Sequence, residues 1–530
     1  MKFINKFNSK IFALGLALSL VLSSCESDLD RLPQSEVTPV SVYADFSNYK
    51  EVLAKVYAGL AISGQKEGDD NPDITGVDGG ASNYLRQYFQ LQELPTDEAI
   101  IAWNDTMLPD LHNMTWAANN QFITAMYYRI YFQVSMANEL IRETTDEKLA
   151  SRNITGEDAE TARLYRNEAR FLRALSYSHA IDMFGNVPFA TESSTVGLVP
   201  PPRIERAELF NYVEKELLEL ENLLKDARTN EYGRADKGAV YMLLAKLYLN
   251  AEVYTGTAKY TEARTYAEKV INAGYSLKGN YEELFLADNN LANPEVIFPI
   301  NFDGLKTRTW GGTTYLIHAA VGGKMEGKDY GINSGWGGLR TTKNLVALFP
   351  GTTGSGDIRG RFFTDGQEAE ISSPSEFTQG YPLIKFKNIT RAGVQGSDAS
   401  GNFVDTDFPL FRLADAYLIY AEAVLRGGGG STATALGYIN QLRTRANAAT
   451  IAQGNLTLDF ILDERARELV WEATRRTDLI RFGKFTSGNY LWPFKGGAKD
   501  GRGVEDFRAL YPIPTSDLIA NPNLIQNTGY

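Results

Sequence analysis

The stretch RELVWEATRRTDLIRFGKF, from Arg467 to Phe485, packs four arginines, two glutamates and an aspartate among large apolar side chains. Its apolar spacing predicts a helix from Asp459 to Ile480, with Leu469 and Ala473 on the buried face. Glutamates recur every fourth residue on the adjacent stripe of that helix, at Glu464, Glu468 and Glu472. The pattern raises the question of whether these carboxylates perform chemistry or hold the fold together.

Two carboxylates within reach of each other are the machinery of a glycoside hydrolase. A general acid, however, needs a raised pKa, whereas neighbouring arginines favour the ionised carboxylate. Glu472 precedes Arg475 by three residues and Arg476 by four, which is the spacing of ion pairs within a helix. We therefore predict an ion-paired scaffold with no catalytic residue, and a glycoside hydrolase is the remote alternative.

The N-terminus carries a secretion signal. Three lysines precede an apolar run from Ile11 to Leu22, which is too short to span a bilayer and fits a signal peptide. The run ends in Leu-Ser-Ser-Cys, a sequence that resembles the lipobox of bacterial lipoproteins, and Cys25 is the only cysteine. We predict a signal peptide in residues 1–24, a lipid anchor at Cys25 that holds the protein to the membrane, and a tether over 25–40.

Composition narrows the class of ligand. The 530 residues are 43% hydrophobic and 22% charged, as in an ordinary globular protein, and the formal net charge is −12. No polybasic patch is present, so nucleic acid is not an expected partner. The acidic balance favours neutral or cationic ligands over anionic ones.

Metal and nucleophile motifs are missing from the sequence. The three histidines do not have the HExxH spacing of a zinc site, and there is no GxSxG nucleophile motif. The loop from Ser63 to Ser82 contains oxygen ligands of the kind calcium prefers, but their spacing does not match an EF-hand. We expect a solvated loop there and keep calcium as the alternative; the residues concerned are Asp69, Asp70, Asn71, Asp73 and Asp78.

The periodicity of the chain predicts a mainly α fold. Small residues alternate with large ones between Lys237 and Tyr275, which resembles a tetratricopeptide-like helical hairpin. Residues 276–409 are rich in glycine and predict an irregular, loop-rich region with a few short strands that carries the ligand face. We expect a helical region over 41–275, and a second region over 276–530 in which helices return at 410–482 before a tail at 483–530. The other predicted helices are Ser47–Ile62, Gln121–Glu143, Asp158–Met183, Glu205–Asp226, Lys237–Glu252 and Tyr260–Ala273.

Five motifs follow each other along the chain: LQELPTDE (Leu91–Glu98), RLADAYLIYAEAVLR (Arg412–Arg426), ALGYINQLRTRA (Ala435–Ala446), DERARELVWEATRRTDLIRFGKF (Asp463–Phe485) and the final YPIPTSDLIANPNLIQNTGY (Tyr511–Tyr530). In this order they resemble the SusD/RagB family of outer-membrane glycan-binding lipoproteins. The resemblance implies a cell-surface protein that captures an oligosaccharide or polysaccharide and delivers it to a SusC-like TonB-dependent transporter. The stretch LQELPTDEAIIAWND looks like that of glucan-associated members, which favours a neutral glucan. A peptide or another non-sugar nutrient is the alternative ligand.

Exposed aromatic plates beside polar side chains are what a sugar site requires. Trp103 follows no strong helical stripe, and Trp310 and Trp336 are flanked by glycines. Each has the alternative of packing in the core, and Asp97 that of capping a helix. Trp116 and Trp471 are assigned to the core, and Trp492 is left undecided. The predicted ligand-binding residues are Trp103, Asn104, Asp105, Trp310, Tyr315, Trp336, Arg86, Tyr84 and Asp97.

Overall fold

The computed structural model describes residues 39–195, 197 and 199–530. The predicted signal peptide, the lipid anchor at Cys25 and all but the end of the tether lie outside the described residues. The chain divides into two compact units, residues 1–49 and 50–530, and the described part of the first contains α2 (Pro39–Val42). The second unit holds all of the described strands and most of the described helices. Within the described ranges, no helix combines the length and hydrophobicity that a membrane crossing requires.

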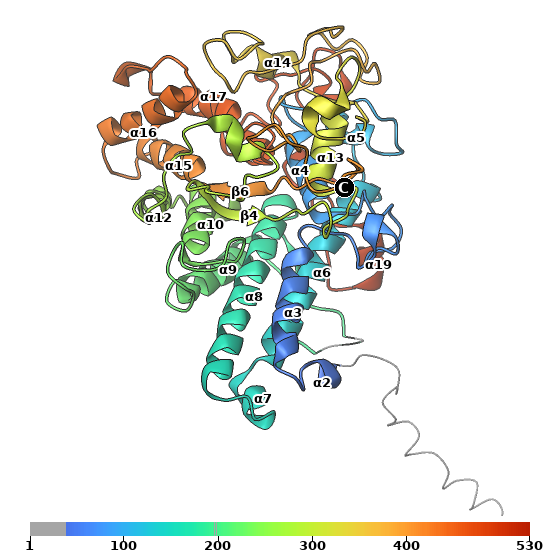
Figure 1. Cartoon of the computed structure of the whole chain (residues 1–530), viewed down its shortest axis with the longest axis vertical. Coiled ribbons are helices and arrows are strands. Elements are labelled where there is room, and N and C mark those ends of the chain that lie inside the picture. Colours follow the sequence, from blue (N-terminus) through green and yellow to red (C-terminus); the bar gives the residue numbers. More distant parts are fainter. Residues whose placement is uncertain (1–38, 196, 198) are drawn as a thin grey trace, which may run out of the picture. The chain divides into compact units, whose positions relative to one another are not determined.

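Helices dominate the described chain, as the composition and periodicity predicted (Figure 1). The helices are α3 (Ser47–Ala58), α4 (Tyr84–Glu93), α5 (Pro109–Asn113), α6 (Gln121–Glu143), α7 (Asp146–Ser151), α8 (Gly156–Met183), α9 (Arg206–Leu220), α10 (Lys237–Leu249), α11 (Ala251–Thr255), α12 (Tyr260–Ile271), α13 (Gly312–Ala320), α14 (Lys343–Val346), α15 (Leu413–Leu425), α16 (Thr432–Arg445), α17 (Leu458–Leu469), α18 (Arg475–Arg481) and α19 (Thr515–Ala520). The strands form three antiparallel pairs, β1 (Ile100–Ile101) with β5 (Leu339–Arg340), β2 (Val187–Pro188) with β3 (Arg203–Ile204), and β4 (Val296–Ile300) with β6 (Phe408–Arg412).

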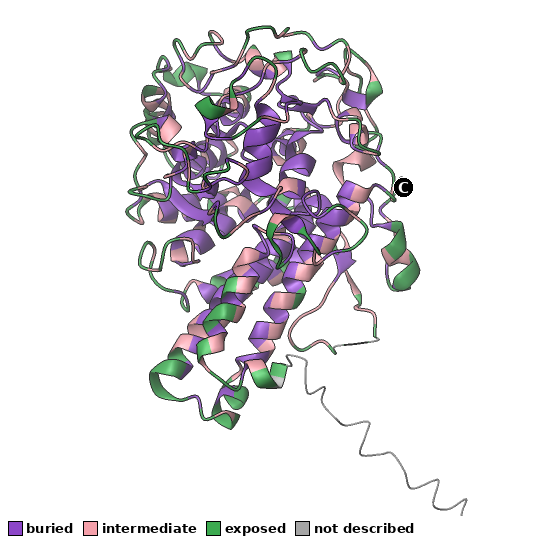
Figure 2. Ribbon diagram, turned by 45° about the vertical axis from the view of Figure 1, so that its right-hand side comes forward, coloured by how far each residue is buried: buried purple, intermediate pink, exposed green. Residues whose placement is uncertain are grey.

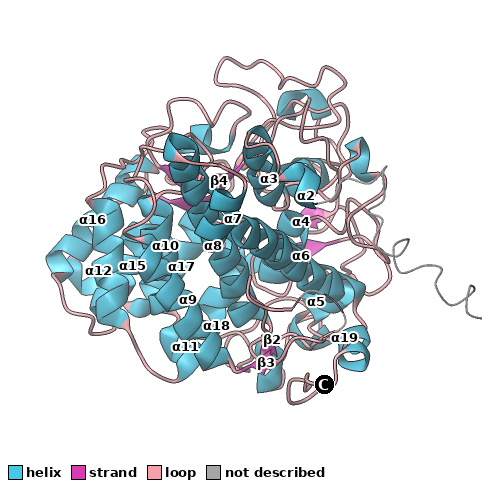
Figure 3. Cartoon of the chain, turned by 90° about the horizontal axis from the view of Figure 1, so that it is seen from below, coloured by secondary structure: helices cyan, strands magenta, loops and turns pink. Residues whose placement is uncertain are grey.

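The helical scaffold is a row in which each helix packs on the next, in the order α6, α8, α9, α10, α12, α15 and α16 (Figure 3). Between α10 and α12 the small residues Ala239, Ala245, Ala263 and Ala267 are all fully buried. Small side chains at such positions let two helices approach closely, so the predicted tetratricopeptide-like hairpin is confirmed. Asp236 begins it by accepting hydrogen bonds from the backbone N–H groups of Gly238 and Ala239.

Buried residues line the facing sides of these helices, and exposed residues gather on loops (Figure 2). Three tryptophans belong to this core: Trp116 and Trp471 are each 1% exposed and Trp492 is 2% exposed. The C-terminal tail closes over one of them, because Trp116 Nε1 donates to the Tyr530 hydroxyl at 2.7 Å. The core assignment of Trp116 and Trp471 is confirmed, and Trp492 joins them.

The prediction of one continuous helix from Asp459 to Ile480 is wrong, because the middle of that range is not helical. The segment forms two helices, α17 and α18, separated by a turn in which Trp471 and Ala473 have φ of 58° and 59°. Non-glycine residues adopt this left-handed conformation only where their surroundings impose it. Here the backbone N–H groups of Trp471 and Thr474 donate to the carboxylates of Glu98 and Glu93, from the LQELPTDE motif. A long-range contact therefore overrides the helical periodicity.

The break also changes the partners of Glu472. Its predicted intrahelical pairs with Arg475 and Arg476 do not form. The Glu472 carboxylate instead forms ion pairs with Lys385 Nζ at 2.6 Å and with Arg412 Nε at 2.6 Å. The ion-paired scaffold exists, but it joins segments far apart in sequence.

The glycine-rich region from residue 276 to 409 is mostly loop, as predicted, and it contributes β4 and β5. It also contains one buried helix, α13, that the periodicity did not predict. The helix predicted from Leu410 begins only at Leu413, because residues 408–412 pair with β4. The predicted boundary between residues 275 and 276 stays a prediction.

Candidate functional site

Three of the predicted tryptophans, Trp103, Trp310 and Trp336, lie together and are only partly buried; we call them the tryptophan cluster. The ring centroids of Trp103 and Trp336 are 6.2 Å apart, and those of Trp336 and Trp310 are 6.0 Å apart. Their planes are tilted by 49° and 54°. Trp103 thus meets two tryptophans that follow it by more than 200 positions in sequence, and the three form a row of indole rings with Trp336 in the middle.

The β1–β5 pair brings Trp103 to Trp336. Ile100 pairs with Arg340 and Ile101 with Leu339, and the Ala102 N–H donates to Gly338 O at 2.9 Å. The indole N–H of Trp103 then donates to Gly337 O at 3.0 Å. Gly338 has φ of +99°, and a Cβ on it would stand 2.6 Å from Trp103 Nε1. Only glycine lets the backbone approach the indole this closely.

Buried polar groups fix the other two tryptophans. The Asp69 carboxylate accepts from the Trp310 backbone N–H at 2.6 Å, and Trp310 packs on Phe403 with centroids 4.6 Å apart. Trp336 stacks on the ring of His318 at 4.7 Å and 25°. The two His318 nitrogens lie 2.7 Å from Ser334 O and 3.0 Å from Asn402 O, which holds that ring in place.

Arg86 supplies the polar part of the site. Its guanidinium carbon lies 4.5 Å from the ring centroid of Tyr315 and 5.7 Å from that of Trp103. Burial lowers the pKa of Arg86, while Tyr315, Asp78 and Asp105 act in the opposite direction. Its Nε is buried without a hydrogen-bond partner among the described residues. The Arg86 side chain as a whole is only partly buried, so its guanidinium brings hydrogen-bond donors to the edge of the cluster.

The loop after Trp103 places two more predicted residues beside the cluster. Asn104 and Asp105 are both exposed, and Asp105 is close enough to Arg86 to influence its pKa. Asp78 is likewise exposed and influences the pKa of Arg86. The rim therefore carries amide, carboxylate and guanidinium groups around partly exposed rings.

Three of the predicted ligand-binding residues lie inside the protein. Tyr315 is fully buried below the cluster, with its ring centroid 5.8 Å from that of Trp103, so it supports a ring and does not face solvent. Tyr84 is 1% exposed and its hydroxyl lies 2.7 Å from His179 Nδ1. Both residues belong to segments that contact or adjoin the cluster, but their side chains point into the core.

Asp97 is also a correction. It is 1% exposed, and its two carboxylate oxygens each accept a 2.7 Å hydrogen bond from the Arg475 guanidinium. The Tyr490 hydroxyl donates to Asp97 Oδ2 at 2.6 Å. Burial raises the pKa of Asp97, but Arg475 outweighs it and keeps the pKa below its ordinary value. Asp97 is thus a buried, ionised residue that stabilises the core through its ion pair with Arg475, and it is not a sugar ligand.

The acidic loop from Ser63 to Ser82 commits two of its carboxylates to partners outside the loop. Asp69 binds Trp310, and Asp73 pairs with Lys55 at 3.3 Å. In the ranges that the structure covers, no three His, Cys, Asp or Glu side chains stand together as a metal site would need. A solvated loop stays the prediction and calcium its alternative, to be settled by titration.

The carboxylates of the charged stretch around Arg467–Phe485 are buried and ion-paired. Glu464 and Glu468 are fully buried, and Arg359 Nη1 lies 2.8 Å from one and 3.0 Å from the other. Burial raises the pKa of Glu468, but Arg445, Arg412 and Arg359 together hold it well below its usual range. A general acid needs the opposite environment. These residues have the chemistry of a scaffold.

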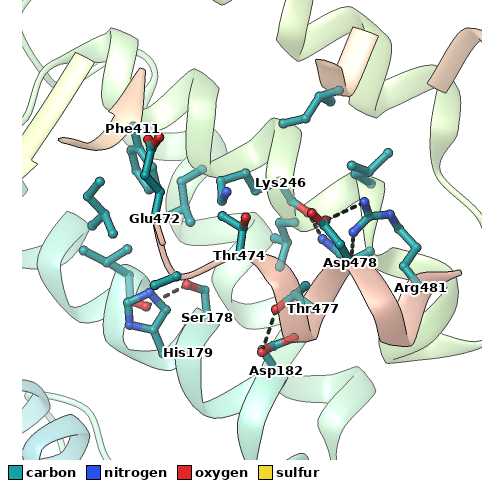
Figure 4. Close-up of a pocket in the computed structure, with 18 of the residues that line it drawn as sticks. Ser178, His179, Asp182, Lys246, Phe411, Glu472, Thr474, Thr477, Asp478 and Arg481 are labelled. Atoms are coloured by element: carbon teal, nitrogen blue, oxygen red, sulfur yellow. Dashed lines mark hydrogen bonds and ion pairs between the residues drawn. The ribbon is translucent and has the colours of Figure 1, made fainter. Parts of the chain in front are cut away.

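An interior cavity lies beside the second half of that stretch (Figure 4). Asp182, Lys246, Asp478 and Arg481 line it, and Arg481 Nη2 donates to Asp478 Oδ1 at 2.7 Å. Its volume is about 60 Å³, room for a few water molecules at ~10–15 Å³ each and too small for a sugar ring. The tryptophan cluster, not this cavity, is the candidate site.

Sequence reasoning missed residues that support the cluster from below or complete its rim. Asp69 and Asp78 enter the sequence analysis only as candidate calcium ligands, and His318 only as one of three histidines without the spacing of a zinc site. No local pattern links His318 to Trp336 across 18 residues of loop and helix. The glycine pair after Trp336, Gly337 and Gly338, was the one feature of the sequence that indicated a close approach of the backbone to another part of the chain.

Comparisons with known proteins place the chain. A model of the SusD family matches residues 361–530, and a model described as "Starch-binding associating with outer membrane" matches residues 29–249. The starch-binding protein SusD of Bacteroides thetaiotaomicron is 37% identical, over 99% of both chains. A SusD-like protein of Bacteroides ovatus is 24% identical over 91% of this chain and 84% of its own.

Solved structures share the fold. Surface glycan-binding protein A of Bacteroides thetaiotaomicron, solved with laminarihexaose, has a TM-score of 0.68 at 20% identity and covers 91% of this chain and 99% of its own. The protein of the same name from Bacteroides uniformis has a TM-score of 0.69 at 22% identity with the same coverage. The match at 37% identity over nearly the whole length confirms the resemblance, and the chain belongs to the SusD family.

Proposed function

We propose that this protein binds a neutral oligosaccharide or polysaccharide at the tryptophan cluster and performs no chemistry on it. The observation that carries the proposal is the row of partly exposed rings formed by Trp103, Trp336 and Trp310. The C–H faces of sugars stack on such rings. Their hydroxyls exchange hydrogen bonds with groups such as Arg86, Asn104 and Asp105 at the rim.

The charges around the cluster support a neutral ligand. Asp78 and Asp105 are exposed beside the guanidinium of Arg86, and the whole chain has a formal net charge of −12. An anionic sugar would meet like charge there, whereas an uncharged one would not. We further propose a glucan, because one relative is named as starch-binding and one structural neighbour holds laminarihexaose. Starch is a polymer of glucose, and laminarihexaose is an oligomer of glucose.

The proposed setting is the cell surface. The family model matched over residues 29–249 describes association with the outer membrane, and the lipobox ending at Cys25 supplies a means of anchoring. We propose a SusC-like TonB-dependent transporter as the partner that receives the glycan. Cys25→Ala should move the protein out of the membrane fraction, and an unchanged distribution would contradict the anchor. Co-purification of that transporter with the full-length protein from solubilised outer membranes tests the partnership.

Binding is tested by calorimetry and by retardation in native gels containing amylopectin, laminarin or, as an anionic polymer, polygalacturonate. Wild type should bind one of the glucans and not the anionic polymer. Trp103→Ala should weaken that binding about tenfold or more, equivalent to ~1.4 kcal/mol. The matched control is Tyr241→Ala, a partly exposed ring on α10, which carries none of the cluster. Binding that survives Trp103→Ala, or a wild type that binds no glucan, would overturn the proposal.

Two other outcomes are informative. Release of reducing ends from a bound glucan would identify a hydrolase. A protein that binds no glucan but copurifies with peptide would favour the non-sugar alternative. The buried, arginine-paired state of Glu464 and Glu468, whose pKa values are both lowered, argues against the first of these outcomes.

A further inference from the structure

An exposed phenylalanine stands beside the tryptophan cluster. Phe377 is 48% exposed, and across the described ranges no other Phe or Trp is exposed to that degree. A Cβ built on Gly338 would lie 3.4 Å from Phe377 Cε1 and 2.6 Å from Trp103 Nε1. One built on Gly337 would lie 3.4 Å from Phe377 Cδ1. The two rings therefore border the same bare stretch of backbone.

The loop that presents Phe377 is held in place by Arg340. This guanidinium is 1% exposed and donates to the carbonyl oxygens of Glu376 and Gln379, and to that of Pro374 at 2.7 Å. Its Nε donates to Gly338 O at 3.1 Å. One buried side chain thus ties the Phe377 loop to the backbone that also receives Ala102 and adjoins Trp103.

The loop is closed on its other side by its own backbone. The Glu368 N–H donates to Thr378 O at 2.8 Å, and the Gly380 N–H donates to Glu368 O at 2.7 Å. Phe377 is therefore exposed from a fixed position, and the cost of ordering a loose loop would not fall on ligand binding.

The exposure of Phe377 is significant because its ring lies next to the tryptophan cluster. Single exposed apolar side chains are common on protein surfaces and need no explanation. Phe377, however, borders Gly338 together with Trp103, whose ring belongs to a row of three partly exposed rings. Its side chain has no polar atom, so it offers a ligand only a flat apolar face. The C–H face of a sugar ring is a ligand group of that chemistry.

We propose that Phe377 forms an additional sugar subsite next to Trp103, occupied only by glycans longer than those the tryptophan cluster holds by itself. The inference rests on the proposed function and adds a determinant of chain length to it. Trp103 lies at one end of the row of indole contacts, and Phe377 approaches the row at Gly338, the glycine that Trp103 also contacts, so we place the additional subsite at the Trp103 end.

The experiment is a length series measured by calorimetry at neutral pH. Maltose to maltoheptaose, and in parallel the laminari-oligosaccharides of the same lengths, are titrated into wild type, Phe377→Ala and Phe377→Tyr. In the series that wild type binds, Phe377→Ala should match wild type within about twofold for the shortest ligands that bind and weaken the longest ones by about three- to tenfold. Phe377→Tyr, which keeps the ring, should restore the gain with length.

Controls separate the subsite from the function as a whole. Val394→Ala removes an even more exposed apolar side chain elsewhere and should change nothing. Trp103→Ala should weaken ligands of every length. If Phe377→Ala binds all lengths as wild type does, or weakens all lengths equally, the subsite is refuted while glycan binding stands. If wild type binds neither series and no glucan polymer, the proposed function fails, and the subsite fails with it.

Discussion

Replacement of Glu468 by glutamine is the sharpest test of the claim that the charged stretch is structural. Glu468 Oε1 accepts from Arg412 Nη1 at 2.6 Å and from Arg445, and Oε2 accepts from Arg359 Nη1 at 3.0 Å. All four side chains are at most 4% exposed. Glutamine keeps the shape and one acceptor oxygen, but removes the charge and points an N–H₂ group at cationic donors.

The size of the effect depends on what the arginines retain. Arg412 and Arg445 both keep Glu295, and Arg359 keeps Asp357 and Glu464, so none is left without a carboxylate. The buried cluster nevertheless gains one uncompensated positive charge. Removing one member of a buried ion pair costs ~3–5 kcal/mol, and we expect the free energy of unfolding to fall by about 3 kcal/mol, at the lower end.

The measurement is urea denaturation followed by tryptophan fluorescence, with the free energy extrapolated to zero denaturant. Glu139→Gln is the matched control, because Glu139 is 37% exposed and its ion pair is with the neighbouring Arg142 on the same helix; it should cost less than ~1 kcal/mol. A Glu468→Gln protein as stable as wild type would refute the structural role. A stable variant that had lost a measurable glycan hydrolysis would show the residue to be catalytic.

Acidification should report the same ion pairs. The folded pKa of Glu468 is depressed, so its contribution to stability is complete above the unfolded pKa of ~4.3 and disappears as the pH falls below it. The stability of wild type should therefore decline more steeply than that of Glu468→Gln below about pH 4.3. Parallel curves for the two proteins would contradict the assignment.

Three further changes probe the site and its support. Gly338→Ala should destabilise the protein by ~1–3 kcal/mol and weaken glucan binding, because φ of +99° and contact with Trp103 both exclude a Cβ; an unchanged melting temperature and affinity would contradict this. His318→Ala removes the ring under Trp336 and should lower glucan affinity by about threefold or more in calorimetry, which equal affinities would disprove. Tyr84→Phe should cost ~1 kcal/mol in urea denaturation and leave affinity unchanged; a weakened affinity would return Tyr84 to the site.

The scaffold was predictable because its determinants are local. The periodicity predicted α6 with the bounds that the structure shows, Gln121–Glu143, and Asn120 caps it by accepting from the N–H of Phe122. The failure came where a distant segment intervened. Glu98 and Glu93 bind the backbone of the turn between α17 and α18, and periodicity within 459–480 contains no trace of them.

The site was predictable only in part, for a related reason. Glycines around Trp310 and Trp336 indicated rings with little local packing, and the structure joins those two tryptophans to Trp103. Tyr84 and Asp97 were predicted in the site because they are close to Trp103 in sequence. That prediction was wrong, because Tyr84 lies on a helix and Asp97 in the turn after it, and both side chains point inward. Phe377 carried no signal, because its neighbour in space is reached only through the β1–β5 pair and Arg340.

The stretch LQELPTDEAIIAWND shows how scaffold and site depend on each other. Its first half is held against the start of α18, because the Asp97 carboxylate and the Arg475 guanidinium make a bidentate ion pair. A few residues later it enters β1, where Ile100 and Ile101 pair with β5. A slip of one residue in so short a ladder would turn Trp103 to the opposite face. Two paired residues supply little register of their own, so we infer that the buried ion pair just before them sets it. Arg475, a member of the charged stretch Arg467–Phe485, therefore acts on the proposed site indirectly, by helping to decide which way the Trp103 ring faces.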